Sequence, residues 1–366
     1  MNMEISRQSQ SAGDNSQQFQ LGNVTNLTIV NGISEQRARE IFQEMNRQTI
    51  AKYTQDARDE AFRRIGVLEN QIMKRAQEVN GVLEAFSDPA FQILLAEAQK
   101  RAAATERKAD YALLSELLVA HVQKGSQRTK RAGINRAIEI VDDIDTQALC
   151  ALTVIHAAGF YVPKSGNISI GLDTLDQMFG KLMHDELPET DEWLDHLDTL
   201  GAIRISSYLK MKTTFEYFID RLSGYACAGI KLHSPEYSQA VKILTDVGIH
   251  QDTLVANECL EGYVRIETRA KNAINEMFIT RNDESIPLTN AQISAIEQVF
   301  SFYSNDQTLI DRAKKNFMDK WGSYKHLHTL QKWWDGIGSA FQITQVGKIL
   351  AHINEKRCDP SLPDLI

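Results

Sequence analysis

The chain has 366 residues, of which 43% are hydrophobic and 24% are charged, and its formal net charge is −8. This length suits two or three packed units, and the composition excludes disorder over the whole chain. Most of the negative charge lies in the C-terminal two-thirds. A large nucleic-acid footprint needs a basic face, so nucleic acid is not the partner that we expect.

Membrane insertion and a cofactor are also not expected. The longest nearly uncharged apolar run, Leu149 to Val162, has 14 residues, whereas a spanning helix needs about 20. The N-terminus MNMEISRQSQ has no signal-peptide or lipidation pattern, so we expect a cytoplasmic protein. The four cysteines are too far apart for a CxxC signature, and we expect reduced, mostly buried thiols.

Residues 1–33 are predicted to form a β-forming self-association segment. Between Gln10 and Gly32 only Asp14 is charged, and apolar residues alternate with polar ones around Phe19 and Ile29, as in short strands. A lone hairpin is marginal in water, and an uncharged, proline-free, Asn/Gln-rich strand can pair with copies of itself. A disordered polar leader is the alternative, because such tails have the same composition. The residues that we expect to mediate assembly are Gly13, Asn15, Gln18, Phe19, Gln20, Gly22, Val24, Leu27 and Ile29, with the glycines in turns.

Residues 34–123 are predicted to form a coiled-coil-like helical arm. Ser34 is a good N-cap residue, and apolar residues recur at spacings of three and four from Ala61 to Phe86. This periodicity is that of one helical stripe, carried by one long helix or by two. Asp88-Pro89 begins a further helix. Short connections make these helices antiparallel neighbours in a bundle.

The stretch Lys124 to Gly133 is the best candidate for a domain boundary. It is basic and contains no large apolar residue. Its basic side chains could hold a phosphate, but a solvated linker is the interpretation that we favour.

Residues 134–366 are predicted to form an α-rich body that ends in a winged-helix-like unit. Helices are expected near 134–143 and 146–158, the second capped by Asp145. The order helix, glycine, strand occurs twice, at 193–205 and at 328–343, and Thr344 can cap a last helix. Helix, turn, strand and helix are the parts of a winged-helix fold. If this unit bound duplex DNA, Lys348 and Lys356 would be its contacts.

No motif in the sequence names a reaction. Neither GxGxxG nor GxxxxGK[ST] occurs, so the two common phosphate-binding loops are missing. Asp191, Asp195 and Asp198 share one helix face and could collect a cation, but a solvated acidic face is the commoner explanation. Cys150 and His156 could form a nucleophile–base pair, but six helical residues place them on different flanks. Core packing explains them better, and packing is also our interpretation of the tandem Trp333–Trp334. We therefore assign no catalytic and no metal-binding residue.

The two ends of the chain resemble a set of uncharacterised bacterial proteins. The head contains Gly13-Asp-Asn-Ser16 followed by Gln20-x-Gly22-Asn23, and the end contains Thr344-Gln-Val-Gly-Lys-Ile-Leu350. Proteins with such heads occur in bacterial conflict systems, where assembly of many copies accompanies an antiviral response. The resemblance thus implies an antiviral role, with a phage or host protein as a trigger. It implies no catalytic residue.

Together these observations predict a mainly α protein: a helical bundle or coiled-coil-like arm with an N-terminal β-forming segment and a winged-helix-like C-terminal unit. As function, we expect a non-enzymatic homo-oligomeric scaffold or sensor, whose first partner is a copy of itself. A winged-helix DNA-binding regulator is the alternative. A hydrolase that uses His156 and Cys150, or the acidic helix, is a third hypothesis.

Overall fold

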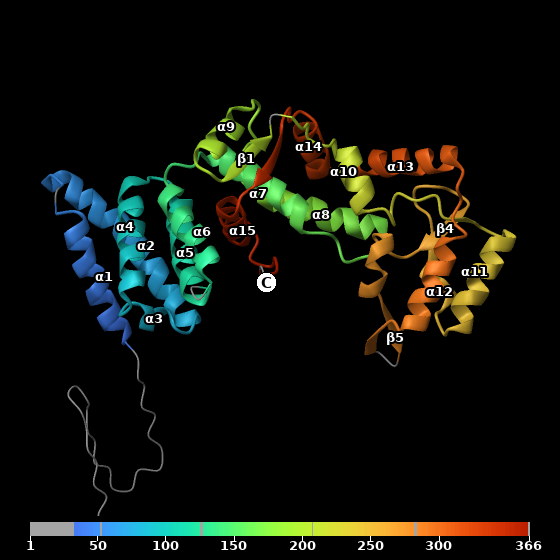
Figure 1. Ribbon diagram of the computed structural model, residues 1–366, viewed down its shortest axis with the longest axis horizontal. Coiled ribbons are helices and arrows are strands. Elements are labelled where there is room, and N and C mark those ends of the chain that lie inside the picture. The colour runs from blue at the N-terminus through green and yellow to red at the C-terminus, as the bar shows by residue number, and fades with distance from the viewer. Residues whose placement is uncertain (1–32, 52, 125–126, 207, 282–283, 365–366) are drawn as a thin grey trace, which may run out of the picture.

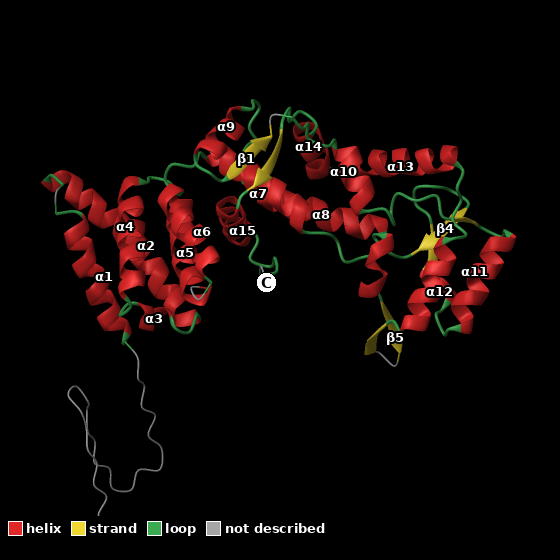
Figure 2. Cartoon of the chain, in the orientation of Figure 1, coloured by secondary structure: helices red, strands yellow, loops and turns green. Residues whose placement is uncertain are grey.

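The computed structural model describes residues 33–364, apart from 52, 125–126, 207 and 282–283. The molecule is elongated and mainly helical, with few short strands (Figures 1 and 2). The main-α class predicted from the sequence is therefore confirmed. The expected self-association residues, from Gly13 to Ile29, lie outside the described residues.

A bundle of helices occupies one end of the molecule (Figure 1). Its helices are α1 (Glu35–Thr49), α2 (Gln55–Glu78), α3 (Val82–Ala85), α4 (Pro89–Ala104), α5 (Lys108–Lys124) and α6 (Arg128–Ile140). α2 packs against both α4 and α5. The N-cap expected at Ser34 is present, since its side chain accepts a hydrogen bond from the backbone N–H of Arg37.

The apolar stripe expected from Ala61 to Phe86 does not run along a single helix. Its first part, through Ala76, is buried along α2. The chain then turns at Gly81, whose φ of 88° lies in the left-handed region that glycine adopts without strain. Phe86 is also buried, but it follows α3, so two helices and a turn together supply the stripe.

Helix α6 begins inside the basic stretch that the sequence suggests as a linker. It starts at Arg128, and Gly133, Ile134, Ala137, Ile138 and Ile140 are its buried residues. Ile134 and Ile138 belong to the same hydrophobic core as the rest of the bundle and as the central helices. The bundle is thus continuous with the body through a shared core.

A further group of helices forms the central part of the molecule. They are α7 (Thr146–Phe160), α8 (Ile168–Leu182), α9 (Glu192–Thr199), α10 (Thr214–Arg221), α13 (Gln307–Gly322), α14 (Lys325–Trp334) and α15 (Gln345–Cys358). The expected caps at Asp145 and Thr344 are present. α15 is the last helix in the chain, yet it packs against α5, α6, α7 and α8.

Strands β1 (Ile203–Ser206) and β7 (Ala340–Ile343) form an antiparallel pair. They are the two strands that follow the repeated helix–glycine pattern in the sequence, and they pair with each other across more than a hundred residues. The pair lies beside α7 and α9 (Figure 2). A winged-helix unit is not confirmed by this arrangement and stays a prediction.

Residues 227–303 form a distal unit with a hydrophobic core of its own, an organisation that the sequence analysis did not anticipate. A three-stranded sheet of order β2-β4-β3 packs with α11 and α12, and the hairpin β5–β6 lies beside them. The elements are β2 (Ile230–Lys231), α11 (Pro235–Asp246), η1 (Gln251–Thr253), β3 (Leu254–Ala256), β4 (Tyr263–Ile266), η2 (Lys271–Glu276), β5 (Phe278–Arg281), β6 (Glu284–Pro287) and α12 (Asn290–Phe300).

Arg265 connects the distal unit to the central helices. Its side chain is 0% exposed, and its guanidinium donates to the carbonyl oxygens of Gly224, Ile266 and Thr268 at 3.4, 3.1 and 3.2 Å. It also donates at 2.8 Å to the carbonyl oxygen of Gly166, in the connection between α7 and α8. The carbonyls of Gly224 and Ile266 have a second donor each, in Cys227 and Thr268. Among the described residues, those of Thr268 and Gly166 have none besides Arg265, so removal of this side chain leaves them unpaired, which is costly.

We therefore predict that Arg265→Ala lowers the free energy of unfolding by about 3 kcal/mol, through the cavity and the unpaired carbonyls. Arg312→Ala, at an exposed position of α13, is the control and should change it by no more than about 0.5 kcal/mol. Urea titration followed by circular dichroism measures both. Equal losses in the two variants would show that Arg265 does not hold the units together.

Candidate functional site

The candidate site is a cavity of about 580 Å³ between the bundle and the central helices, which we call the junction pocket. The bundle contributes α5 and α6, and the central part contributes α7, β7 and α15. Its lining residues are Ala120, Lys124, Lys130, Ile134, Ile155, His156, Gly159, Phe160, Phe341, Gln342, Ile343, Gln345, Lys348, Ile349, His352 and Ile353. Apolar walls with a few polar side chains are typical of small-ligand sites.

The helical period explains why these side chains meet. On α15, Gln345, Lys348 and His352 recur at spacings of three and four, which places them on one face. On α6, Lys130 and Ile134 are four residues apart in the same way. The pocket is thus lined by the facing stripes of helices that are packed together.

Gly133 allows α6 and α15 to approach closely next to the pocket. A Cβ atom at this position would lie 2.8 Å from Cδ1 of Ile349 and 3.1 Å from Cγ of Gln345. Both distances are shorter than ordinary van der Waals contact, so a side chain at residue 133 would require Ile349 and Gln345 to shift.

A buried carboxylate, Glu355, lies directly behind two of the lining histidines. Its Oε1 is 2.6 Å from Nδ1 of His156, and its Oε2 is 3.4 Å from Nδ1 of His352. Tyr161 donates its hydroxyl to Oε2 at 3.0 Å. An ionised carboxylate only accepts hydrogen bonds, so the Nδ1 atom of His156 carries the hydrogen.

The protonation of this group follows from burial and hydrogen bonding. Burial alone would raise the pKa of Glu355, but the hydrogen bonds from His156, His352 and Tyr161 outweigh it and lower the pKa below the ordinary value. Burial and the adjacent Glu355 raise the pKa of Tyr161. The carboxylate is therefore charged and the phenol neutral at physiological pH.

This arrangement fixes the ring of His156 and leaves Nε2 as its second polar atom, on a residue that lines the pocket. The ring also stacks on Phe160, with centroids 5.7 Å apart and an angle of 9°. With Nδ1–H donated to Glu355, Nε2 is the ring atom that remains for a ligand in the pocket.

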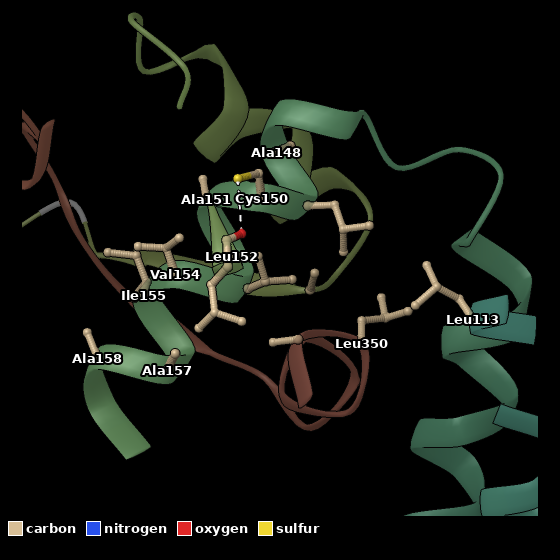
Figure 3. Packing of buried hydrophobic residues seen from close by; sticks show 14 of the residues in the cluster. Leu113, Ala148, Cys150, Ala151, Leu152, Val154, Ile155, Ala157, Ala158 and Leu350 are labelled. Atoms are coloured by element: carbon tan, nitrogen blue, oxygen red, sulfur yellow. Dashed lines mark hydrogen bonds between the residues drawn. The ribbon is translucent and has the colours of Figure 1, made fainter. Parts of the chain in front are cut away.

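The proposed partnership between Cys150 and His156 does not form. The Cys150 thiol points away from the pocket, toward the carbonyl oxygens of Leu182 and Asp185. Burial raises its pKa to about 11, which keeps it a thiol. Figure 3 shows Cys150 among the apolar side chains of α7, so core packing accounts for it.

The two lysines suggested as DNA contacts lie on α15 in different surroundings. Lys348 is exposed at the pocket, whereas Lys356 donates to the carbonyl oxygens of Pro360 and Leu362 and pairs with Asp364. α15, which carries both lysines, is covered by four other helices. That position does not favour insertion of α15 into a DNA groove.

The tandem tryptophans and Asp198 have partners within the fold. Trp333 packs on Trp193 and donates to the carbonyl of Pro188, and Trp334 is buried and donates to the carbonyl of Lys212. Asp198 lies 3.9 Å from Arg204. Within residues 33–364, gaps excepted, no cluster of three or more metal-ligating side chains has the geometry to hold an ion.

Another cavity, of about 700 Å³, lies between residues 183–193 and α14. Its walls include the carboxylates of Asp185, Glu186, Glu189 and Asp191, on a segment that is mostly without regular structure. We favour the junction pocket as the site, because packed helices shape it and because buried side chains orient its histidines.

Sequence reasoning found part of this site. The basic stretch at 124–133 was considered for an anion, and it supplies Lys124 and Lys130. Glu355, Tyr161 and His352 were missed, since a carboxylate and a tyrosine nearly two hundred residues apart give no local signal. The one feature that could have pointed to the network is Glu355, an acidic residue on the last helix among positions that the structure shows to be buried.

A protein-family model whose description is only the suffix "-like" matches residues 32–363. Because this match covers most of the chain, the chain belongs to that family. The description states no activity. None of the curated proteins and none of the solved structures matches the chain. In the part of the chain that the structure describes, no helix is long and apolar enough to cross a bilayer.

The Glu355 network predicts a pH-dependent contribution to stability. At neutral pH, Glu355→Gln should lower the free energy of unfolding by about 1–3 kcal/mol, because an amide cannot accept all three donors. The folded-state pKa lies below the ordinary 4.5, so the contribution is complete above that value and is lost as the pH falls through the folded-state pKa. The gap between wild type and variant should therefore narrow in acid.

Urea titrations at pH values from neutral to acid measure this gap. Glu297→Gln, at an exposed position of α12, is the matched control. A gap that is absent at neutral pH, or one that widens in acid, contradicts the assignment of a charged Glu355.

Proposed function

We propose that this protein is a homo-oligomeric sensor or scaffold whose helical body binds a small ligand in the junction pocket. The observation that carries the proposal is the position of that pocket, between the bundle and the central helices. A scaffold needs no cavity at such a junction. A sensor needs a site at which ligand binding changes the relative position of two parts of the molecule.

The pocket suits this role because its walls belong to both parts of the molecule. α5 and α6 face α7, β7 and α15 across it. A ligand that touches both walls stabilises the arrangement in which they are close, and it gains nothing from an arrangement in which they have separated. Binding therefore shifts the population toward the closed arrangement.

Self-association is the second half of the proposal, and it is assigned to the first 32 residues. Ser34 caps α1 through its own side chain, and Ile33 packs on the core. The first helix thus has its cap within the described residues. On this proposal, residues 1–32 pair with other copies while the helical body folds on its own core.

The setting that we propose is the bacterial cytoplasm, with a role in antiviral defence. The support for this setting is the resemblance of the head to those of conflict-system proteins. A phage or host component would then supply or release the ligand.

Deletion of residues 1–32 tests the self-association. We expect the truncated protein to keep the helices that the full chain has within residues 33–364, because the cap of α1 remains. Its mass by light scattering should fall from that of an oligomer to that of a smaller species or a monomer. Far-ultraviolet circular dichroism on the same samples checks the fold.

The matched control replaces residues 1–32 by a Gly/Ser-rich segment of the same length, which is flexible. If self-association depends on the leader, this variant should behave like the deletion. An unchanged mass in both variants would place self-association in the body or show that there is none.

A further inference from the structure

The structure assigns to the junction pocket an amphiphilic anion as ligand: an aliphatic chain that carries a carboxylate or phosphate group. The inference rests on the proposed sensor function, because it names the ligand of that same pocket. The family match indicates no such ligand, and the sequence alone pointed only to a phosphate at the basic stretch 124–133, with no aliphatic chain.

Charge is the first argument. Lys124, Lys130 and Lys348 line the pocket, and no acidic side chain does so within the part of the chain that the structure describes. Three cations around a mainly apolar cavity outnumber the single carboxylate of Glu355 behind its histidines, so they attract a negative group and repel a positive one. The protein as a whole is acidic, with a net charge of −8, so this local excess of lysine is not a consequence of overall composition.

The second argument is the apolar wall. Five isoleucines line the pocket: Ile134, Ile155, Ile343, Ile349 and Ile353. Phe160 adds an aromatic ring that is 47% exposed. Burial of one methylene group is worth about 0.8 kcal/mol, so an aliphatic chain is the body that gains most from such walls.

His156 and His352 supply polar groups among these apolar side chains. Both rings are held by Glu355 through Nδ1. The ammonium groups of the lysines supply the hydrogen-bond donors for one headgroup, and the two histidines add polar atoms to the same lining.

Segments of the chain itself are poorer occupants. The first 32 residues are nearly uncharged between Gln10 and Gly32, so they do not complement three lysines. The C-terminal tail is closer, since Asp364 pairs with Lys356 at 3.1 Å and interacts electrostatically with Lys124 and His352. The side chain of Asp364 is 89% exposed, so its contacts with these residues are weak and a ligand can displace it.

The experiment is isothermal titration calorimetry of the full-length protein at low salt. The probes share one chain length: decanoate, decyl phosphate, decanol and decyltrimethylammonium, each kept below its micelle concentration. We expect both anions to bind, decanol to bind at least fivefold more weakly, and the cation to bind more weakly still. The tighter of the two anions identifies the headgroup, which separates fatty acids from phosphate esters.

A chain-length series tests the aliphatic body. From hexanoate to octanoate to decanoate, the affinity should rise about fourfold for each added methylene, as burial at about 0.8 kcal/mol per group requires. Equal affinities across the series overturn the assignment of an aliphatic chain. Equal affinities of decanoate, decanol and the ammonium compound overturn the assignment of an anion.

Variants locate the binding. The pair Lys130→Gln and Lys348→Gln should weaken decanoate fivefold to tenfold, since each exposed ion pair contributes up to about 1 kcal/mol. The control pair Lys242→Gln and Lys315→Gln, on α11 and α13, changes the net charge equally and should leave affinity within twofold. Asp364→Asn should tighten binding, because it removes a competing carboxylate. Equal effects of the two lysine pairs would contradict binding in the junction pocket.

Failure of this inference can be told from failure of the sensor function. If decanoate binds as expected but leaves the light-scattering mass unchanged, the ligand class stands and the sensor function fails. If no probe binds while the mass still depends on residues 1–32, the ligand class fails and self-association stands.

Discussion

Helix α15 determines how the rest of the molecule is assembled, and the Glu355 carboxylate fixes its position. α15 is buried against helices of both the bundle and the central part. Figure 3 shows Leu350 of α15 between Leu113 of α5 and the side chains of α7. A charged group at 0% exposure is tolerated only when it is paired, so Glu355 favours the placement of α15 that brings it to His156 of α7 and to Tyr161. His352, on α15 itself, adds a contact from the same helix. Asn354 adds a hydrogen bond to Thr153 of α7 at 2.8 Å.

The same contacts frame the junction pocket. Hydrogen bonds of Glu355 and Asn354 attach α15 to α7, and Gly133 allows α6 to approach α15 closely. The space that remains is lined by the isoleucine and lysine stripes of the facing helices. Structural stability and ligand recognition thus share residues, since the carboxylate that holds the fold also orients the histidines of the site.

Much of the fold was predictable from local patterns, and the site was predictable only in part. Helix starts at Ser34, Asp145 and Thr344 follow from capping chemistry, which is local. A division of the stripe into two helices was one of the alternatives, but its place at Gly81 and the start of α6 at Arg128 were not foreseen, because tertiary burial decides both. The strands at 203–206 and 340–343 were recognised, but their pairing is a long-range event. The Glu355 network and the separate core at 227–303 depend on contacts between distant segments, for which a single sequence gives no signal.

Hydrogen–deuterium exchange of the backbone amides of α15 tests the central claim most directly. If α15 belongs to a core shared by the bundle and the central helices, its amides should exchange as slowly as those of α5 and α7 and should open together with them. Fast exchange throughout α15, with α5 and α7 still protected, would show that the C-terminal helix is a peripheral element. The shared core and the junction pocket would then both be wrong.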